Sequence, residues 1–258
     1  MNDVQKEAAE HKIDLDKVGV KGVRYPIVVL DKKNGYQNTV ATISMYVDLP
    51  RHFRGTHMSR FIEILNRHSH RMTLDNIAPI LTEMKEKLDA RSAHLEMAFP
   101  YFIEKAAPVS GQKSIMVYDC EFIASQGDED ELIVVISVPV MSLCPCSKEI
   151  SDRGAHNQRG IVTVKVKAKE LVWIEDIVRL VEGAASSDVY ALLKREDEKY
   201  ITERAYDNPR FAEDMVRQIA VELEKMPQIT WFSVETENYE SIHNHNAYAA
   251  VSRNTGDL

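Results

Sequence analysis

Alternating apolar and polar residues are the feature that most restricts how this chain can fold. Apolar side chains occupy every second position across residues 41–49, and again across residues 162–167. A period of two predicts β-strands with one buried and one exposed face. Across residues 58–65 and 77–88 apolar residues recur instead at helical spacing, which predicts two amphipathic helices. The chain is therefore predicted to combine antiparallel strands with helices that pack against them.

The predicted elements follow an order that occurs twice. In the first half, strands at 25–30 and 41–49, joined by a turn at 32–35, precede the helices at 58–65 and 77–88, and strands at 94–103 and 116–122 follow. After a polar loop at 126–130, the second half has strands at 132–140 and 162–167, a helix at 171–181, a polar helical insertion at 188–207, a helix beginning at Asn208 and Pro209, and strands at 229–234 and 242–251. The repeat is one of element order rather than of residues.

This order predicts an α+β fold of two tandem ββααββ modules, each a four-stranded antiparallel sheet with two helices. We place a mobile N-terminal tail at residues 1–20, the first module at 21–127 and the second at 128–258, and expect both modules to form one compact unit. Sheets of this kind leave exposed edges, which association commonly covers. We therefore expect a homo-oligomer built by sheet-to-sheet extension.

Composition excludes some classes of partner. The 258 residues include 32 Lys and Arg against 40 Asp and Glu, for a net charge of -8, which argues against nonspecific binding to nucleic acids or membrane surfaces. No apolar run approaches membrane-spanning length, and residues 1–17 lack the apolar core of a signal sequence. Three cysteines cannot all pair in disulfides. We expect a cytoplasmic protein.

Two cysteines and a histidine form the most specific chemical pattern. Cys144 and Cys146 end an apolar run, and His156 follows after a short polar loop. Thiolate and imidazole are ligands that a borderline-soft divalent metal prefers. Either cysteine could reach His156, and the alternative is two buried thiols beside a loop histidine. Because the neighbouring residues are polar, we favour a metal site. Cys120 lies on the apolar face of a strand and is predicted to be core.

Three other polar segments are candidates for chemistry. The charged run at 194–199 is either a solvated helix face or the source of a carboxylate that completes a metal site with one open position. A basic loop at 51–60 leads into a helix; it suits a phosphate, and a solvated basic turn is equally compatible. Glu240 can accept two hydrogen bonds from the edge of a purine or pterin.

His243 and His245 are two residues apart on the last predicted strand. They are therefore expected on one face of that strand, about 6.5 Å apart along it. This face is otherwise apolar, and an unsatisfied buried imidazole is costly. Satisfied core histidines are one interpretation, and a proton-transfer pair beside a substrate is the other.

Four segments together resemble the type IB GTP cyclohydrolase I family. They are residues 142–151 (SLCPCSKEIS), 154–159 (GAHNQR), 55–60 (GTHMSR) and 240–245 (ESIHNH). The resemblance covers roughly residues 20–250, and its most specific part is the block from Cys144 to Arg159. It implies a bimodular tunnelling fold, assembled as a homotetramer with active sites at subunit interfaces.

The resemblance also assigns roles to individual residues. It implies that the metal is bound by Cys144, His156 and Glu198, and that Glu240 anchors the guanine ring. It places Cys146, His243 and His245 near the reacting centre, as proton-transfer groups or as supports for the ligands. By charge and position, the predicted phosphate contacts are Arg60, Arg159 and Lys199.

The reaction implied by the resemblance is hydrolysis of GTP to 7,8-dihydroneopterin triphosphate and formate, the first step of folate or pterin synthesis. Water activated by the metal would attack guanine C8, and a histidine would assist ring opening. The ligands suit zinc, and also iron or manganese. Two alternatives are another tunnelling-fold enzyme acting on a purine or pterin, such as a nitrile reductase, and a non-catalytic nucleotide-binding oligomer stabilised by metal.

Overall fold

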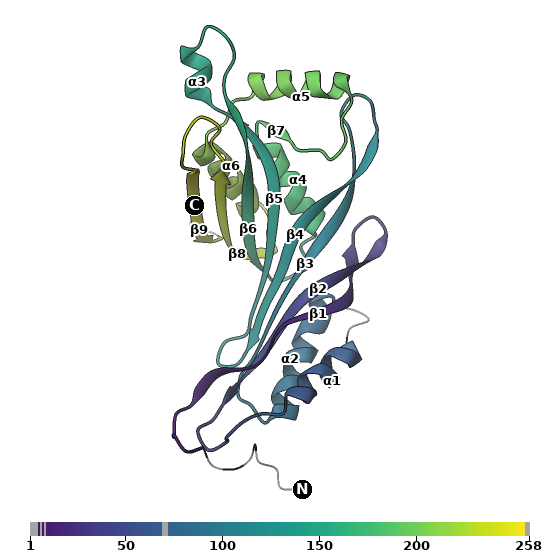
Figure 1. The fold of residues 1–258 in the computed structure, drawn as a ribbon, viewed down its shortest axis with the longest axis vertical. Coiled ribbons are helices and arrows are strands. Elements are labelled where there is room, and N and C mark those ends of the chain that lie inside the picture. The colour runs from purple at the N-terminus through teal and green to yellow at the C-terminus, as the bar shows by residue number, and fades with distance from the viewer. Residues whose placement is uncertain (1–4, 6, 8, 69–71, 256–258) are drawn as a thin grey trace. The chain divides into compact units, whose positions relative to one another are not determined.

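In the computed structural model, the described residues are 5, 7, 9–68 and 72–255. The first group of elements is β1 (Leu15–Asp31), β2 (Gly35–Leu49), α1 (Met58–His68), α2 (Leu74–Leu88), β3 (Ala93–Ala106) and β4 (Lys113–Gln126). The second is β5 (Glu131–Leu143), α3 (Pro145–Ile150), β6 (Asn157–Ala168), α4 (Ile174–Ala184), β7 (Ser187–Asp188), α5 (Arg195–Asp207), α6 (Ala212–Glu224), β8 (Ile229–Asn238) and β9 (Ala247–Asn254) (Figure 1). The α+β order is confirmed, because the second group repeats ββααββ with α3 and β7–α5 added. No helix in the described ranges is long and apolar enough to cross a membrane.

The strands pair in the order β1-β2-β3-β4-β5-β6-β8-β9, and β7 pairs with β5. β1 runs antiparallel to β2, from the Leu15–Leu49 pair to the Asp31–Gly35 pair. β6 is likewise antiparallel to β8, and β8 is antiparallel to β9. Hairpin-connected antiparallel strands are what the alternating pattern predicts.

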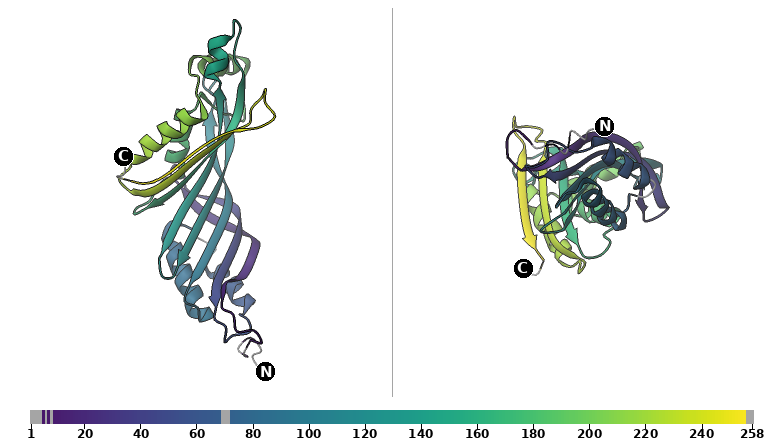
Figure 2. Two further views of the ribbon diagram at one scale, coloured as in Figure 1. Left: turned by 90° about the vertical axis from the view of Figure 1, so that its left-hand side faces the viewer. Right: turned by 90° about the horizontal axis from the view of Figure 1, so that it is seen from below.

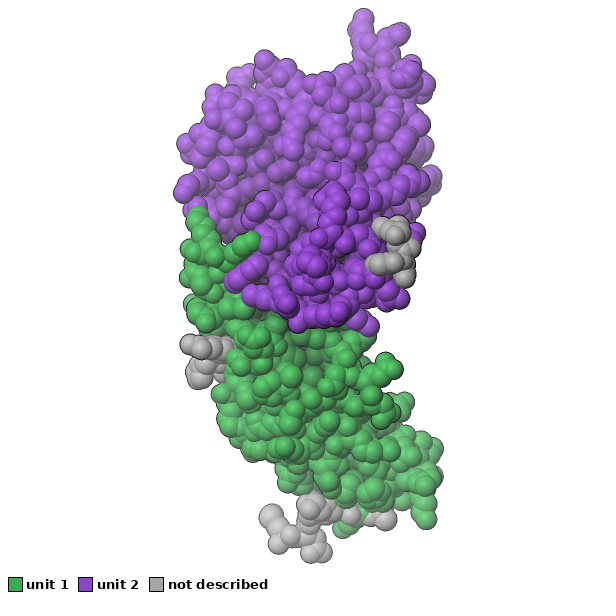
Figure 3. Space-filling view, turned by 180° about the vertical axis from the view of Figure 1, so that it is seen from behind, with its two compact units in different colours: residues 1–100, 121–134 green, residues 101–120, 135–258 purple. Residues whose placement is uncertain are grey.

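The chain forms two compact units, which Figure 3 draws in different colours. Unit 1 comprises residues 1–100 and 121–134, and unit 2 comprises residues 101–120 and 135–258. The limits of these units fall inside β3, β4 and β5, so they do not coincide with the tandem modules. The division of modules near residue 128 therefore stays a prediction.

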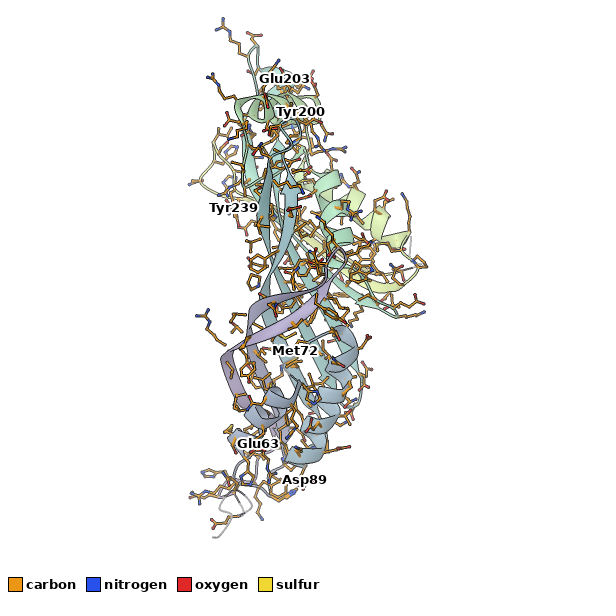
Figure 4. The ribbon with its side chains drawn as sticks, turned by 90° about the vertical axis from the view of Figure 1, so that its right-hand side faces the viewer. Glu63, Met72, Asp89, Tyr200, Glu203 and Tyr239 are labelled. Carbon is orange, nitrogen blue, oxygen red and sulfur yellow. The ribbon has the colours of Figure 1, made fainter. Side chains whose placement is uncertain are left out.

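In unit 1, the alternating residues of β2 pack under the two helices. The fully buried side chains of β2 and α1 are Ala41, Ile43, Met45, Val47, Phe61 and Ile64. α2 ends at its C-cap, Asp89 (labelled in Figure 4). Asp89 is left-handed, with a φ of 54°, and its N–H donates to the carbonyl of Lys85. The period-two and helical patterns thus predicted the buried faces correctly.

In unit 2, α4 and α6 supply the helical layer. α6 lies along β8 and β9, as Figure 2 shows. The apolar side chains of β6 and β8 that are fully buried are Val162, Val164, Val166, Phe232 and Val234. The core of this unit therefore comes mainly from the repeated elements, to which α5 adds Ile201 and Ala205, whereas α3 has no buried residue.

β1 is longer than the sequence suggested. It begins at Leu15, so residues 15–20 are strand rather than part of the predicted tail. Backbone pairing with β2 stabilises this stretch although its composition is polar, and composition alone does not report such pairing. Two register shifts interrupt the pairing, between Leu15 and Val18 and between Val20 and Val23. Gly22 adopts a φ of 72° at the second shift, a conformation that glycine tolerates best.

The predicted helix start at Asn208 is wrong. Asn208 follows the last residue of α5, and its Nδ2 donates to the carbonyls of Ala185 (3.0 Å) and Ser186 (3.3 Å). The next helix, α6, begins only at Ala212. Pro209 has no N–H with which to continue α5, so the Asn-Pro pair ends one helix rather than starting another.

Candidate metal and nucleotide site

Cys144 and Cys146 lie at the start of α3, where the sequence suggested a polar loop. Pro145 occupies the first helical position, where its fixed φ is favourable and its missing N–H would be unpaired anyway. Cys144 caps the helix, and its Sγ accepts the N–H of Ser147 at 3.4 Å. Cys144 is half-buried, whereas Cys146 is exposed. The capping contact therefore fixes Cys144 more firmly than Cys146.

His156 lies beside Cys144. The N–H of Cys144 donates to the carbonyl of His156 at 3.1 Å, and the N–H of His156 donates to Ser147 Oγ at 3.3 Å. Gly154, with a φ of 76°, lies in the loop between α3 and β6, where the chain reverses direction. The structure thus brings together the cysteine and the histidine that the sequence singled out.

The imidazole of His156 is held by two side chains. Its Nδ1 lies 2.9 Å from Gln158 Oε1 and 3.8 Å from Glu240 Oε2. The side chains of His156 and Glu240 are each only 13% exposed, so water screens this pair weakly. Gln158 Nε2 donates in turn to Ser142 Oγ at 2.8 Å. The predicted metal ligand and the predicted guanine anchor are therefore neighbours within unit 2.

The loop between β8 and β9 corrects one prediction. β9 begins at Ala247 rather than at residue 242, so His243 and His245 lie on an exposed loop and not on a strand face. Their rings stack with centroids 5.1 Å apart. Residues 241–246 are all exposed, which excludes the interpretation of core histidines. The loop is fixed at its start by Tyr239 (labelled in Figure 4), whose N–H donates to the carbonyl of Arg159 on β6 at 2.9 Å.

Asp197 anchors the start of α5. It is fully buried within the charged run and accepts the N–H groups of Val109 (2.8 Å), Ser110 (2.9 Å) and Lys194 (2.8 Å). The Ser110 hydroxyl donates a further bond of 2.6 Å. Burial acts to raise the pKa of Asp197, but these hydrogen bonds prevail and lower it. The interpretation of this run as a solvated face is therefore wrong for Asp197.

Glu198 and Lys199 follow in the first turn of α5 and are exposed. Among the described residues, no three His, Cys, Asp or Glu side chains are close enough to form a ready metal cluster. The structure therefore places Cys144 with His156, and does not add Glu198 to them. The ligand role of Glu198 stays a prediction.

The far end of α5 contacts α3. Lys148 Nζ donates to the carbonyl of Tyr206 and lies 4.3 Å from the centroid of its ring. Figure 1 shows both helices at the same end of unit 2. No residue of α3 is buried, so this contact is a principal restraint on the helix that carries both cysteines.

A polar network joins β7 and α5 to the rest of unit 2. Lys105 Nζ lies 2.7 Å from Glu182 Oε1 and 3.0 Å from Asp188 Oδ2. Tyr118 donates to Glu182 at 2.9 Å, and Arg204 lies 3.4 Å from Asp188. Burial raises the pKa of Glu182, although the neighbouring Lys105 opposes the shift. Because its charges are paired, the network has a structural role.

Comparison with known proteins identifies the family. A family model described as "Type I GTP cyclohydrolase folE2" matches residues 1–249. The chain belongs to this family. The GTP cyclohydrolase FolE2 of Geotalea uraniireducens (strain Rf4) is 62% identical over 253 residues, covering 98% of this chain and 93% of the relative. That of Geobacter sulfurreducens is 57% identical over 253 residues, covering 98% of each chain.

Solved structures confirm the tunnelling fold expected for the family. A uricase from Bacillus fastidious aligns with a TM-score of 0.58 at 9% identity, over 97% of this chain and 95% of the uricase. Uricase from Arthrobacter globiformis aligns with a TM-score of 0.53 at 10% identity, over 94% of each chain. At such low identity the likeness concerns the fold alone.

The predicted phosphate contacts have different surroundings. In unit 1, Arg60 Nη1 donates to the carbonyl of Lys87 at the end of α2, at 2.6 Å, which is a structural contact. In unit 2, Arg159 is exposed on β6, and Lys199 lies 3.7 Å from Glu203 (labelled in Figure 4). Their roles toward phosphate stay predictions for this member of the family.

Sequence reasoning missed the side chains that support the site. Gln158 is the second residue of β6 and lies two residues after His156, which precedes the strand, and the two side chains meet at 2.9 Å. A polar residue two positions after a candidate ligand is a pattern visible in the sequence, and it indicates a side chain able to contact that ligand. Asp197 carried no such signal, because one buried carboxylate in a charged run looks like its exposed neighbours. Cys120 is buried as predicted, and burial raises the pKa of its thiol.

Proposed function

We propose that this chain hydrolyses GTP to 7,8-dihydroneopterin triphosphate and formate, the entry step of folate or pterin synthesis. Family membership over nearly the whole chain supports the proposal. The observation that carries it is the separation of 3.8 Å between His156 Nδ1 and Glu240 Oε2. A candidate metal ligand lies beside a carboxylate that suits the edge of guanine.

The residues present fit a divalent metal. Cys144 and His156 offer a thiolate and an imidazole on adjoining segments, and these donor types suit zinc first, with iron and manganese as alternatives. Glu198 is the proposed third ligand, from the first turn of α5. A metal held by this set supplies the Lewis acidity that makes water nucleophilic at neutral pH.

Residues of the chain would orient the base and move protons. The carboxylate of Glu240 can accept both the N1–H and the 2-amino group of guanine, which fixes the base in one orientation. His243 and His245, on their exposed loop, are proposed to transfer protons while the imidazole ring opens and the ribose rearranges. Cys146 is proposed as a further group near the reacting centre. Arg60, Arg159 and Lys199 are proposed to bind the triphosphate.

We also propose a cytoplasmic homotetramer with active sites at subunit interfaces. β1 and β9 are the terminal strands of the pairing order, and such strands can pair with a second copy. Exposed apolar side chains on both strands, including Leu15 (48%) and Tyr248 (63%), favour association. Sedimentation equilibrium tests this assembly, and a monomer at micromolar concentration contradicts it.

The decisive experiment uses metal-stripped protein. GTP is added with zinc, iron, manganese or no metal, pterin is read by fluorescence after oxidation, and formate is assayed in parallel. We expect both products in equal amounts, only with metal. The Glu240→Gln variant keeps the size of the side chain but loses one acceptor, so it should raise KM for GTP more than it lowers kcat, while metal content stays that of the parent.

Two results overturn the proposal. Folded protein that binds metal and GTP but forms neither product favours the non-catalytic nucleotide-binding alternative. Consumption of a different purine or pterin, with GTP unchanged, favours another reaction on the same fold.

A further inference from the structure

Gln158 has no role in the reaction outlined above, yet its side chain is engaged at both ends. Oε1 lies 2.9 Å from His156 Nδ1, and Nε2 donates to Ser142 Oγ at 2.8 Å. Gln158 is 7% exposed and Ser142 is fully buried. A buried amide that leaves either end unsatisfied is costly. The hydroxyl of Ser142 can donate or accept, so it can pair with either end of the amide. Glu240 Oε2 can only accept and lies 3.8 Å from His156 Nδ1, so it favours an N–H there, and the amide of Gln158 then presents its oxygen to the imidazole.

The surroundings of Nδ1 decide which ring nitrogen carries the proton. A neutral imidazole has one N–H and one lone pair. Nδ1 faces two acceptors, Gln158 Oε1 at 2.9 Å and Glu240 Oε2 at 3.8 Å. A lone pair on Nδ1 would be repelled by both oxygens, whereas an N–H is attracted by both. The hydrogen therefore belongs on Nδ1, and the lone pair on Nε2 is left for a ligand.

We infer that Gln158 is a positioning residue that acts through His156 and makes Nε2 the metal-binding nitrogen. Ser142 holds the far end of the Gln158 amide, and the amide together with Glu240 fixes both the tautomer and the rotation of the ring. The inference rests on the proposed role of His156 as a metal ligand. It assigns the buried pair Gln158 and Ser142 to the metal site rather than to the core.

The first test measures Co²⁺ affinity by competition with a coloured chelator, using the visible absorption of the Co²⁺–thiolate centre. Gln158→Met keeps the size and removes the acceptor, so it should weaken Co²⁺ binding by about 10- to 100-fold. Gln158→Glu restores an acceptor and should return the affinity close to that of the parent. Gln112→Met is the control, because Gln112 is exposed and its bonds to Ala107 and Ser110 use the backbone.

The second test reads the tautomer without metal. Solid-state ¹⁵N spectra of protein labelled at histidine nitrogens, with His156→Asn to assign the signals, should show a protonated Nδ1 and an unprotonated Nε2 for His156. In Gln158→Met the Nε2–H form should gain population. Circular dichroism of the metal-free variants checks that the fold is kept. If Gln158 had a purely structural role, neither the Co²⁺ affinity nor the tautomer of His156 would change in a variant that keeps the fold.

The outcomes separate this inference from the proposed function. Parent-like Co²⁺ affinity in Gln158→Met, or an Nε2–H form in the parent, overturns the inference. Loss of affinity in Gln158→Met with rescue in Gln158→Glu supports it, even if the parent does not turn over GTP. A parent that binds no Co²⁺ overturns the ligand assignment and the inference together.

Discussion

The two ββααββ groups of this chain have the same element order but differ in what interrupts it. In the first group, α1 and α2 follow each other directly between β2 and β3. In the second, α3 separates β5 from β6, and β7 with α5 separates α4 from α6. Cys144 and Cys146 belong to the first of these additions, and Glu198 and Lys199 to the second. The repeated elements thus supply most of the core, while the additions carry several of the groups proposed to react.

If α3 can lose its capping cysteine without loss of activity, the added segments do not carry the reactive groups. Cys144→Ala removes the proposed thiolate ligand and is expected to lower GTP turnover by at least about 1,000-fold. Because Cys144 is only half-buried, the metal-free melting temperature should change little. Pterin fluorescence and bound metal are the measurements, and Cys120→Ala, in the core, is the control that should keep turnover per folded molecule. Loss of metal in Cys146→Ala alone would transfer the ligand role to Cys146.

Truncating one isoleucine in a repeated helix and one in an added helix tests whether the two kinds of element differ in their contribution to stability. Ile64 on α1 is fully buried, whereas Ile150 on α3 is 85% exposed. Ile64→Ala should lower the free energy of unfolding by about 2 to 5 kcal/mol and leave kcat of the folded fraction unchanged. Ile150→Ala should change stability by less than about 0.5 kcal/mol. Urea denaturation measures both, and equal costs would contradict the division between core and additions.

A smaller effect is expected from the contact between the two added helices. Lys148→Met removes the hydrogen bond to the Tyr206 carbonyl and the cation over its ring. A net hydrogen bond contributes about 1 kcal/mol, so kcat/KM for GTP should fall on the order of fivefold to tenfold, with little change in melting temperature. Lys225→Met, on the surface of α6, is the matched control. If the two variants have the same kcat/KM, α3 needs no restraint from α5.

The smallest expected effect on stability concerns Glu83 on α2, in the first ββααββ group. Burial opposes ionisation of Glu83, but hydrogen bonds from His68 and Lys87 and the charge of Arg67 lower its pKa from 4.5 to about 2. Since the folded pKa is the lower one, the ionised carboxylate stabilises the fold above pH 4.5, and this contribution is lost as the pH falls toward 2. Glu83→Gln should remove up to about 1 kcal/mol at pH 7 and only a small part of that at pH 2, where most of the contribution is already lost. Urea midpoints at both pH values measure this, and an equal loss at both excludes an ionic origin.

The predictable parts of this molecule are those set by local patterns. Alternation across residues 41–49 predicted β2, because its buried and exposed faces follow from a two-residue period. The order of elements predicted the fold class, and the spacing of the cysteine pair from His156 predicted that Cys144 or Cys146 would lie near it. Each of these depends on residues near one another in the sequence.

The parts that sequence reasoning missed depend on distant partners. β1 extends to Leu15 because β2 pairs with it, and Asp197 is buried because the turn at Val109 and Ser110 lies against it. His243 and His245 were placed on a strand because an apolar stretch follows them, although the polar residues around them favour a loop. The approach of Glu240 to His156 joins segments far apart in the sequence, so no local pattern could reveal it.

The two register shifts in β1 also bear on how the chain avoids fibrils. β1 ends the pairing order within the described chain, and a straight terminal strand of 17 residues would be a template on which identical chains stack without limit. The shifts between Leu15 and Val18 and between Val20 and Val23 bend the strand and divide that template into short stretches. A newly made chain is thereby less able to stack with identical chains along this strand.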